Sequence, residues 1–569
     1  MFYMTLTQPL WGPASPPTIY CNLTCTSISR PLTPPTIPTQ PNPAMEPELE
    51  ADSYDVVVIG TGLAESIAAA ALAKAGKSVL HLDPNEYYAA SQASLTLDEL
   101  VQWSNDHSTP STAGPSTGIT ELFTDASCTD LTPELEAQRR RYALSLFPAV
   151  LPSRGDLIDT LIKSDVSKYV SFRMLDSVCI WHDAPGDTGS PGDGRGPRGR
   201  VQRVPGSKEE VFKDKSVSLI EKRRLMKFLM FAAGDFETDD LLNGKEDQPL
   251  KQFLEDSFSL PAHLASSVMY AISHCTSPAE PTLPALRRTR RYLRSVGRYG
   301  PGAFLVGQYG GVGEVAQGFC RACAVFGGTY VLGPTASPSS VEIRDDSVVL
   351  QVQCHPQPIT ASHLISSPLH LPQSAQHTDI HSELNSIARC IAVLDALPPA
   401  LKRPKVEGEE EESKEEDDTA IVVFPPEKED GQVVRALIMG EGTGSCPAGR
   451  YVLYLSTRVD RAQDAKETLQ PYLRRLAGVP LFESYHVSHH RQTTASASSA
   501  VSPSSPLVVL APYAGREGLT EGLDWEAEQG KRAYDAVMGI GEGVRGFFEN
   551  DAGEGEGEAD EEGDEGFDM

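Results

Sequence analysis

Hydrophobic and polar positions follow two different periods along the chain, and the first clear pattern begins near residue 54. An apolar, β-branched run at residues 55–59 ends at Gly60 and predicts a buried parallel strand followed by a tight turn. Residues 67–75 are rich in alanine and leucine and predict a helix, and residues 78–82 predict a second strand that ends at Asp83. This order is typical of a βαβ dinucleotide-binding unit.

One residue departs from the dinucleotide pattern. Gly60 and Gly62 match the first two glycines of G-x-G-x-x-G, and Asp83 matches the acid that binds ribose hydroxyls. The third glycine is replaced by Glu65, at a position where helix and strand approach closely. The sequence therefore predicts the fold of such a unit and weakens the prediction of a bound cofactor.

A helical period of 3.6 residues governs a later region. It covers residues 213–233, 250–258, 261–272 and 282–296. The second half of its first helix is unusually apolar and includes Leu225, Phe228, Leu229 and Phe231. Such a helix is usually part of a core, and the alternative is a site for an apolar ligand between helices.

The order of these patterns predicts an α/β fold, with a FAD-binding-like (Rossmann-type) domain into which an all-helical domain is inserted. We expect the α/β domain to comprise residues 51–207 and 298–548, and the helical domain residues 208–297. Stretches rich in Pro, Ser, Gly or acidic residues predict flexible insertions at 104–135, 183–200, 355–385, 402–418 and 488–505. Residues 1–50 and the acidic tail 549–569 are expected to be disordered.

A second glycine-rich region follows the helical domain. Residues 303–306 predict a strand, residues 315–326 a helix and residues 329–332 another strand. Cys320 and Cys323 have Cys-x-x-Cys spacing, but they lie inside an apolar helix, which indicates buried structural thiols rather than redox chemistry.

The formal net charge of -29 argues against nucleic acid or an anionic membrane as a direct partner. Ten cysteines without a regular framework argue against disulfides and zinc sites, and favour a reducing cytosol. A histidine-rich loop gives only an irregular metal pattern, so no metal site is predicted; its histidines are His355, His363, His370, His377 and His381.

We expect a cytoplasmic protein, because no window approaches the roughly 20 apolar residues of a membrane helix and no basic segment followed by an apolar core begins the chain. Residues 402–405 resemble a nuclear localisation signal, which leaves a nuclear pool as an alternative. The stretch that begins at Met45 is a natural short lead into the first strand, and the hypothesis is that residues 1–44 come from an upstream start in gene prediction.

Five motifs, spread between residues 54 and 330, resemble those of the family of Rab escort proteins and Rab GDP-dissociation inhibitors. They read YDVVVIGTGLAES, VLHLDPNEYYAAS, LIDTLIKSDVSKYVSF, EKRRLMKFLMF and QYGGVGEVAQGFCRACAVFGGTY. The family is similar in fold to flavoprotein oxidases but is not known to use the flavin, so the resemblance implies no cofactor. A Glu65 carboxylate in the first helical turn would satisfy the helix dipole in place of a pyrophosphate.

Within the family, the residues of these motifs are more similar to those of fungal-type escort proteins, known as component A of Rab geranylgeranyltransferase. Dissociation inhibitors carry an arginine in the stretch that reads YAISHCTSPAE here, and this chain lacks it. One departure is that Tyr87-Tyr88 is followed by Ala89-Ala90, where the family has two glycines. Any positive backbone φ that those glycines supplied is therefore in doubt.

The resemblance implies a chaperone for prenylation without catalytic residues of its own. Such proteins bind GDP-bound Rab GTPases, present them to the Rab geranylgeranyltransferase heterodimer and deliver the geranylgeranylated product to membranes in transient contacts. By motif position, the residues implied in Rab binding are Tyr87, Tyr88, Arg298, Tyr309, Gly310, Gly313, Glu314 and Gln317. For residues 309–317 the alternative is a tight structural turn.

The helical domain is implied in binding the transferase and the prenyl group. Leu225 and Leu229 are candidates for the apolar groove, and Phe228 or Phe231 for the transferase contact. Two other functions remain open: a Rab GDP-dissociation inhibitor that recycles prenylated Rabs, and an active flavin-dependent oxidoreductase.

Overall fold

The structure is a computed structural model in which part of the chain is described. The described residues are 49, 51–108, 122–183, 199–205, 211, 217–371, 384–402, 417–426, 431–459, 464–491, 505–511, 513, 519–540 and 543–550. The predicted N-terminal extension and the acidic tail lie outside these residues, except for Leu49, Glu549 and Asn550.

The predicted βαβ unit forms the centre of a seven-stranded sheet. Strand β1 (Ser53–Ile59) pairs in parallel with β2 (Val79–Asp83), and β2 pairs in parallel with β11 (Thr329–Leu332). On its other side β1 pairs in parallel with β14 (Ile359–Ser366). The sheet is completed by β13 (Val348–Val352), β12 (Pro338–Ile343) and β20 (Leu507–Val509).

Strand β1 is apolar on both faces because both faces are covered. Val56 and Val58 face a core shared with α1 (Leu63–Lys74), α10 (Val312–Val325) and α13 (Gly522–Met538). Val57 and Ile59 point the opposite way, to a core with the β13–β14 hairpin. The alanines of α1 let the neighbouring helices approach closely, and a Cβ at Gly530 of α13 would lie 2.6 Å from the Ile67 side chain.

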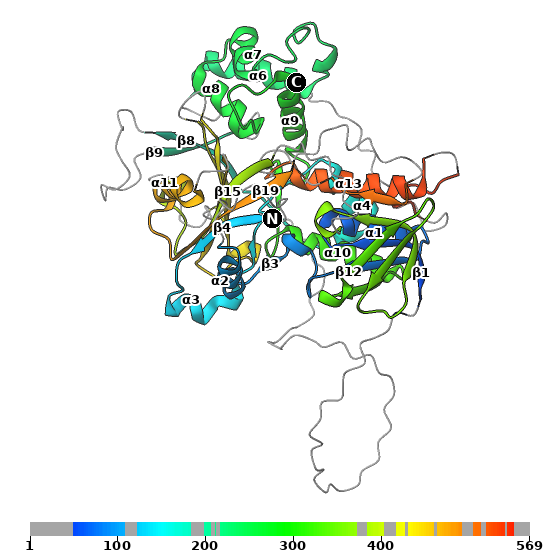
Figure 1. The fold of residues 1–569 in the computed structure, drawn as a ribbon. Coiled ribbons are helices and arrows are strands. Elements are labelled where there is room, and N and C mark those ends of the chain that lie inside the picture. The colour runs from blue at the N-terminus through cyan, green and yellow to red at the C-terminus, as the bar shows by residue number, and fades with distance from the viewer. Residues whose placement is uncertain are drawn as a thin grey trace, which may run out of the picture. The chain divides into compact units, whose positions relative to one another are not determined.

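A second sheet has eight strands in the order β4-β19-β15-β18-β17-β16-β8-β9. Neighbours in it are antiparallel except β16 and β8. The bounds are β4 Phe123–Cys128, β19 Phe482–Arg491, β15 Leu384–Leu394, β18 Tyr451–Val459, β17 Val434–Gly440, β16 Thr419–Phe424, β8 Ser177–Asp183 and β9 Gly199–Arg203. Helix α11 (Ala465–Ala477) packs its leucines against one face of this sheet (Figure 1).

Shorter elements connect the two sheets. A small sheet joins β6 (Leu151–Pro152), β10 (Phe304–Gly307) and β7 (Phe172–Met174), and β3 (Ser94–Leu95) pairs with β5 (Leu144–Ser145). In sequence, helices α2 (Leu97–Asp106) and α3 (Pro133–Gln138) lie between β3 and β5, and helix α4 (Asp156–Lys163) lies between β6 and β7.

Four α-helices that the structure describes in full within the predicted helical region gather in one group (Figure 1). They are α6 (Leu219–Ala233), α7 (Leu250–Phe258), α8 (Ala262–Ser267) and α9 (Thr282–Ser295), with a π-helical turn at Val268–Ile272. We refer to residues 219–295 as the helical segment. Their apolar side chains belong to the same core as one face of the eight-stranded sheet.

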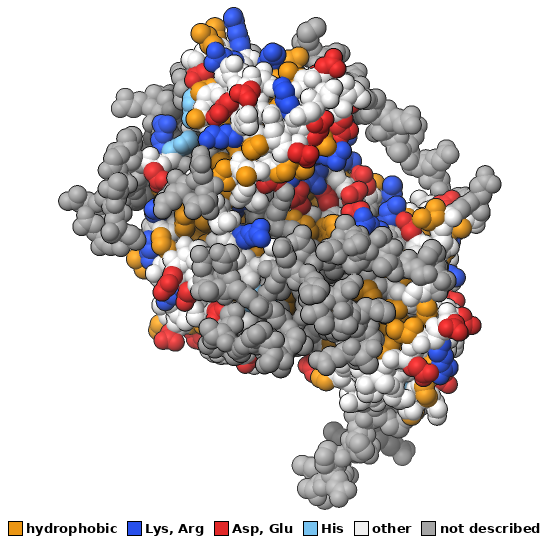
Figure 2. Space-filling model, turned by 45° about the horizontal axis from the view of Figure 1, so that its top comes forward, with side chains coloured by type: hydrophobic (Ala, Val, Ile, Leu, Met, Phe, Trp, Pro, Cys, Tyr) orange, Lys and Arg blue, Asp and Glu red, His pale blue; other side chains and the backbone are white. Residues whose placement is uncertain are grey.

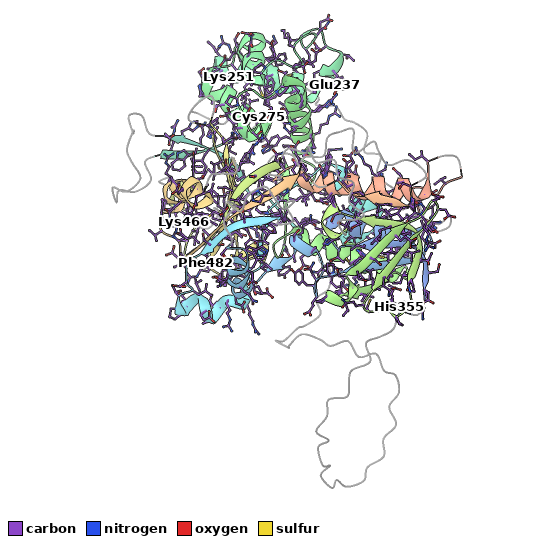
Figure 3. The ribbon with its side chains drawn as sticks, in the orientation of Figure 1. Glu237, Lys251, Cys275, His355, Lys466 and Phe482 are labelled. Carbon is purple, nitrogen blue, oxygen red and sulfur yellow. The ribbon has the colours of Figure 1, made fainter. Side chains whose placement is uncertain are left out.

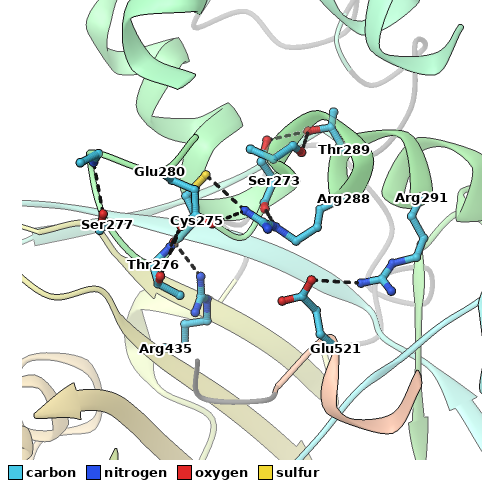
Figure 4. A network of polar contacts seen from close by, with 12 residues as sticks. Ser273, Cys275, Thr276, Ser277, Glu280, Arg288, Thr289, Arg291, Arg435 and Glu521 are labelled. Atoms are coloured by element: carbon cyan, nitrogen blue, oxygen red, sulfur yellow. Dashed lines mark hydrogen bonds and ion pairs between the residues drawn. The ribbon is translucent and has the colours of Figure 1, made fainter. Parts of the chain in front are cut away.

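A buried polar network holds the helical segment on the sheet. Arg435 of β17 donates to the carbonyl oxygen of Cys275 at 2.8 Å, and Arg288 pairs with Glu280 at 2.8 Å (Figure 4). Figure 3 places Cys275 between the helices and the sheet, whereas Lys251 and Glu237 lie farther out. Both members of the Arg288–Glu280 pair are buried, so each neutralises a charge that would otherwise be costly.

Three of the predicted insertions are corrected where the structure describes them. Residues 104–135 contain edge strand β4, residues 355–385 contain β14, and residues 488–505 contain the end of β19. Their Ser, Thr and His content hid them, because most of the strands with which they pair lie far away in sequence. Of the remaining insertions, 184–198 and 403–416 lie outside the described residues, and Asp417 is buried beside Arg203.

The surface shows no single dominant charge on the face drawn in Figure 2, where acidic and basic side chains are interspersed. Across the described part of the chain, the helices are too short or too polar to serve as membrane spans.

A buried histidine on β19 gives a test of this packing. His486 is fully buried beside Trp103 and Phe123, and both of its ring nitrogens lack a hydrogen-bond partner. Replacing it by phenylalanine removes this unsatisfied polarity. We expect His486→Phe to raise the free energy of unfolding by roughly 1 kcal/mol, measured by urea denaturation.

The control is His489 on the same strand, which bonds Thr124 at 2.8 Å and Ser386 at 2.9 Å. His489→Phe should destabilise the protein by roughly 1–3 kcal/mol, since the Thr124 and Ser386 hydroxyl groups each lose a hydrogen bond. Equal effects of the two substitutions would contradict the assignment.

Candidate functional site

The turn between β1 and α1 has the backbone of a dinucleotide cradle, but side chains of the chain itself fill it. Gly60 has φ 98°, and a Cβ there would lie 2.7 Å from the His370 ring. A Cβ at Gly62 would lie 2.6 Å from a carboxyl oxygen of Glu65. The backbone N–H of Leu63 donates to Oε1 of Gln92 at 2.8 Å. The space and the donors that a pyrophosphate would use are therefore taken.

Glu65 fills the cradle as a buried carboxyl group. The residue is 6% exposed. Burial is the larger cause and repulsion from Glu526 the next, and together they raise the pKa of the Glu65 carboxyl group to about 8. At neutral pH most molecules carry the neutral acid there. This corrects the expectation that a charged carboxylate satisfies the helix dipole, because burial penalises the charge more than the helix end favours it.

Asp83 is committed to holding the turn. Its Oδ2 accepts hydrogen bonds from the Thr61 amide at 2.7 Å and hydroxyl at 2.5 Å, and its Oδ1 accepts two from Asn85 at 2.8 Å. A carboxylate offers about four acceptor positions. With these used, Asp83 has no free position for a ribose, and the cradle as a whole does not fit a flavin dinucleotide.

The segment that follows β2 presents aromatic side chains. Tyr87 is 50% exposed, and Tyr88 is half-buried with its ring edge-on to Tyr330 at 5.7 Å. Ala89 and Ala90 have φ values of 74° and 46°, so the left-handed backbone is kept without glycine. The Ala89 amide donates to the Thr61 hydroxyl at 2.9 Å, which ties the segment to the cradle.

The second predicted segment lies against the first. Ser94 donates to the Tyr309 carbonyl oxygen at 2.7 Å across 215 residues of sequence. A Cβ at Gly310 would lie 2.3 Å from the Ser94 hydroxyl, and one at Gly313 would lie 3.0 Å from the Gln92 carbonyl oxygen. The glycines thus form the tight turn of the alternative interpretation, and this turn joins two segments predicted to bind the same partner.

Around this junction lie the side chains that we call the tyrosine platform: Tyr87, Tyr88, Tyr309, Glu314 and Gln317. Tyr309 is 53% exposed, with its ring packed against Gly444. Gln317 is exposed on α10, and Glu314 is half-buried, with its pKa raised by burial. The arrangement offers aromatic and hydrogen-bonding groups to a protein surface.

Sequence reasoning missed a neighbour of the platform. One turn beyond Gln317, the exposed Arg321 lies over the Tyr169 ring with its guanidinium carbon 4.6 Å from the ring centre. The i, i+4 spacing from Gln317 was the available signal. Arg298, the basic residue implied in Rab binding, donates to the Ser153 carbonyl oxygen at 2.9 Å and lies over the Tyr299 ring, which holds the chain before β10.

In the helical segment the predicted residues divide between core and surface. Phe228 is fully buried, and Leu225 and Leu229 are each 7% exposed. Phe231 is half-buried in an aromatic cluster with Phe236, Phe253 and Phe258. In this structure α6 therefore serves as core, and of the two phenylalanines Phe231 remains the more accessible.

The thiols of Cys320 and Cys323 and the described histidines are the candidates for reactive or metal-binding groups. Burial raises the pKa of Cys320 to about 12 and that of Cys323 to about 11. Both thiols therefore stay protonated, which is typical of unreactive structural cysteines. Among the described residues no three His, Cys, Asp or Glu side chains are placed to hold a metal ion. His377 and His381 lie outside them. A cavity of about 330 Å³ lies between α8, α11 and strands β8 and β16, and no predicted site residue lines it.

Comparison with known proteins decides the family. The profile of a family described as GDP dissociation inhibitor matches residues 49–118 and 110–486. The chain belongs to the GDP dissociation inhibitor family. The resemblance found from the five motifs is thereby confirmed.

Relatives in this family carry two kinds of name. Proteins named Rab proteins geranylgeranyltransferase component A are 30% identical over 422 residues in Saccharomyces cerevisiae and 32% identical over 415 residues in Drosophila melanogaster. These alignments cover 73% and 71% of this chain. A protein of Arabidopsis thaliana named Rab escort protein 1 is 28% identical, over 81% of this chain and 86% of its own. The chain spans 63% of the length of the yeast relative and 74% of the Drosophila one.

Solved structures confirm the predicted fold class. A Rab GDI from Plasmodium falciparum superimposes with a TM-score of 0.62 at 19% identity, over 86% of this chain and 99% of its own. An oxidoreductase from Methanosarcina mazei gives a TM-score of 0.50 at 13% identity, over 83% and 98%. This chain therefore shares an α/β fold with both proteins. At 19% and 13% identity, the likeness carries no information on activity.

Glu65 gives a pH test of the filled cradle. Its pKa is about 8 in the folded protein against 4.5 ordinarily, so its contribution to stability is complete below pH 4.5 and is lost as the pH rises through 8. A glutamine at position 65 does not titrate, so the stability of the Glu65→Gln variant has no such dependence on pH. We expect the free energy of unfolding of Glu65→Gln, relative to that of the native protein, to rise by roughly 3 kcal/mol between pH 6 and pH 9 in urea denaturation.

The control is Glu528→Gln, at an exposed glutamate of α13 that pairs with Arg532. Its difference from the native protein should stay constant over the same range. If the Glu65→Gln difference also stayed constant, the carboxyl group would not be buried as described.

Ala90 gives a test of the backbone conformation. Since its φ is 46°, a side chain there is strained, and glycine relieves the strain. We expect Ala90→Gly to raise the free energy of unfolding by roughly 1 kcal/mol. Ala93 has φ -59°, so Ala93→Gly should instead lower it by roughly 0.5–1 kcal/mol; stabilisation by both would argue against the left-handed turn.

Proposed function

We propose that this chain is a Rab escort protein. It binds GDP-bound Rab GTPases on the tyrosine platform, presents them to the Rab geranylgeranyltransferase heterodimer and delivers the geranylgeranylated product to membranes. In this role the chain is a non-catalytic regulatory subunit of the transferase, in the cytosol. A nuclear pool rests on residues 402–405 alone, of which 403–405 lie outside the described residues.

The observation that carries the proposal is the junction of residues 87–94 with residues 309–317. Two segments far apart in sequence meet through Ser94 and Tyr309 and leave two tyrosine side chains about half exposed. Exposed aromatic side chains on a rigid frame are typical anchors of protein interfaces. Family members in yeast, Drosophila and Arabidopsis are named for the transferase or for escorting Rabs, which supports the identity of the partner.

The helical segment is the proposed place for the lipid and the transferase. A twenty-carbon isoprenoid costs on the order of 10 kcal/mol to leave in water, so a carrier needs an apolar groove. The core around Leu225 and Leu229 is the proposed source of this groove, which requires the helices to separate. Phe231 is the proposed transferase contact, because it lies nearer the surface than Phe228.

A second candidate function is that of a Rab GDP-dissociation inhibitor that recycles prenylated Rabs. A fission-yeast protein named probable secretory pathway GDP dissociation inhibitor 1 is 27% identical over 76% of this chain. Against it stands the stretch 270–280, which lacks the arginine of the inhibitors. Cys275 in this stretch is fully buried and accepts a bond from Arg435.

A flavin oxidoreductase is the third alternative, and the filled cradle argues against it. Glu65, His370 and Gln92 take the places that a pyrophosphate would need. The absorbance spectrum of the purified protein tests this directly, since a bound flavin is yellow.

The first test is reconstituted prenylation with the transferase, a GDP-loaded Rab and geranylgeranyl diphosphate. An escort protein stimulates lipidation of the Rab. Failure to stimulate, with extraction of prenylated Rab from membranes retained, would favour the dissociation inhibitor.

The tyrosine platform is tested by Tyr88→Ala and Tyr309→Ala. Each removes an aromatic contact, so we expect the Kd for a GDP-loaded Rab to rise about 10-fold or more, in line with 1–3 kcal/mol for an interface anchor. The thermal midpoint should change little for Tyr309→Ala, whose ring is 53% exposed. Isothermal titration measures the affinity.

Val479→Ala is the matched control, because Val479 is an exposed hydrophobic residue, at 83%, outside the platform. It should leave the affinity unchanged. Native affinity in both tyrosine variants would contradict the assignment of the platform.

A further inference from the structure

Three segments far apart in sequence meet at the first turns of α13. Asp524 is buried there; its Oδ1 accepts from the Leu157 amide at the start of α4 at 3.1 Å. Its Oδ2 accepts from Arg291 of α9 at 2.8 Å. A Cβ at Gly155 would lie 2.5 Å from the Asp524 carboxylate, so this approach depends on glycine. We call the Arg291–Asp524 bond the α9 latch.

Other groups strengthen the latch from the same side. Arg291 also donates to the Thr520 carbonyl oxygen at 3.3 Å and lies 3.9 Å from the Glu521 carboxylate (Figure 4). Arg291 is thus the group through which α9, in the helical segment, is held on the beginning of α13. A bond between a partly exposed arginine and a buried carboxylate is directional and can be broken.

Two residues beyond Asp524, α13 contacts Gln92, which lies beside the tyrosine platform. Glu526 accepts from Gln92 Nε2 at 3.3 Å, and Gln92 Oε1 accepts from the Leu63 amide at 2.8 Å. The Gln92 backbone packs on Gly313, and Ser94, two residues on, bonds Tyr309. The first turns of α13 therefore contact the helical segment directly and are connected to the platform through Gln92 and the residues beside it.

Helix α13 is suited to transmit a displacement. Its inner face packs tightly on α1, with Gly530 against Ile67 and with Ala527, Ala533 and Tyr534 almost fully buried. A closely packed helix moves as a unit rather than bending locally. Burial raises the pKa of Asp524 to about 6 in spite of Arg291, so the ion pair offsets only part of the cost of burying the carboxylate.

We propose that the first turns of α13 couple the tyrosine platform to the helical segment, with Arg291 and Asp524 as positioning residues. In the free protein the α9 latch holds the helical segment in place. A GTPase that binds the platform displaces Gln92 from Glu526, shifts the turn and weakens the latch. This inference rests on the proposed function, because it needs a GTPase on the platform.

The test compares the native protein with Arg291→Gln. Since binding to a two-state element is reciprocal, a variant without the latch should bind a GDP-loaded, unprenylated Rab about 5-fold more tightly. Without the Rab, the α9 amides of Arg291→Gln should undergo hydrogen exchange about 5-fold faster than those of the native protein. Adding the Rab should accelerate α9 exchange in the native protein and not in the variant.

Arg287→Gln is the matched control on the same helix, because Arg287 pairs with Glu237 inside the helical segment. It should show native affinity and a native response. Asp524→Asn keeps the shape of the side chain and an acceptor for Leu157, and it should reproduce Arg291→Gln, with no further gain in the double variant.

The outcomes separate the two levels of the argument. If the Rab binds the native protein but α9 exchange does not respond, or if Arg291→Gln leaves the affinity unchanged, the coupling is wrong and the proposed function stands. If the Rab does not bind the native protein, the proposed function fails and the coupling fails with it.

Discussion

Much of the structure depends on the burial of the Glu65 side chain at the start of α1. A helix end with free amide groups and a glycine turn attracts an anion, and in a dinucleotide enzyme that anion is a pyrophosphate. Here a carboxyl group from the helix itself lies over Gly62, and Gln92 takes the Leu63 amide. The strand, turn and helix keep their geometry while losing the space for a ligand.

Filling the cradle changes the role of the residues around it. Asp83 uses both carboxylate oxygens to hold Thr61 and Asn85, which fixes the chain just before Tyr87. Gln92 becomes the connection between the cradle, α13 and the residues beside Gly313. The segment after β2 is thus tied to the turn between β1 and α1, with Tyr87 half exposed and Tyr88 packed against Tyr330.

The two regions to which the proposed function assigns the GTPase and the lipid are held on one frame. The tyrosine platform lies beside the seven-stranded sheet. The helical segment is held on the second sheet by Arg435 of β17, and on α13 by the bond from its own Arg291 to Asp524. The buried Arg288–Glu280 pair is internal to the helical segment, whereas Arg291 is partly exposed. The helical segment is therefore held by one contact that is fully buried and by one that solvent reaches.

The sequence by itself determined the βαβ unit, the 3.6-residue period of the helical segment and the exchange of a glycine for Glu65, because these are local patterns. It did not determine strands β4 and β14, whose polar residues resemble a loop until their partners are known. Only the tertiary structure joined Ser94 to Tyr309 and Arg291 to Asp524, across 215 and 233 residues. It also decided that Glu65 is a neutral acid rather than a charged cap, since its pKa follows from burial, which no local pattern encodes.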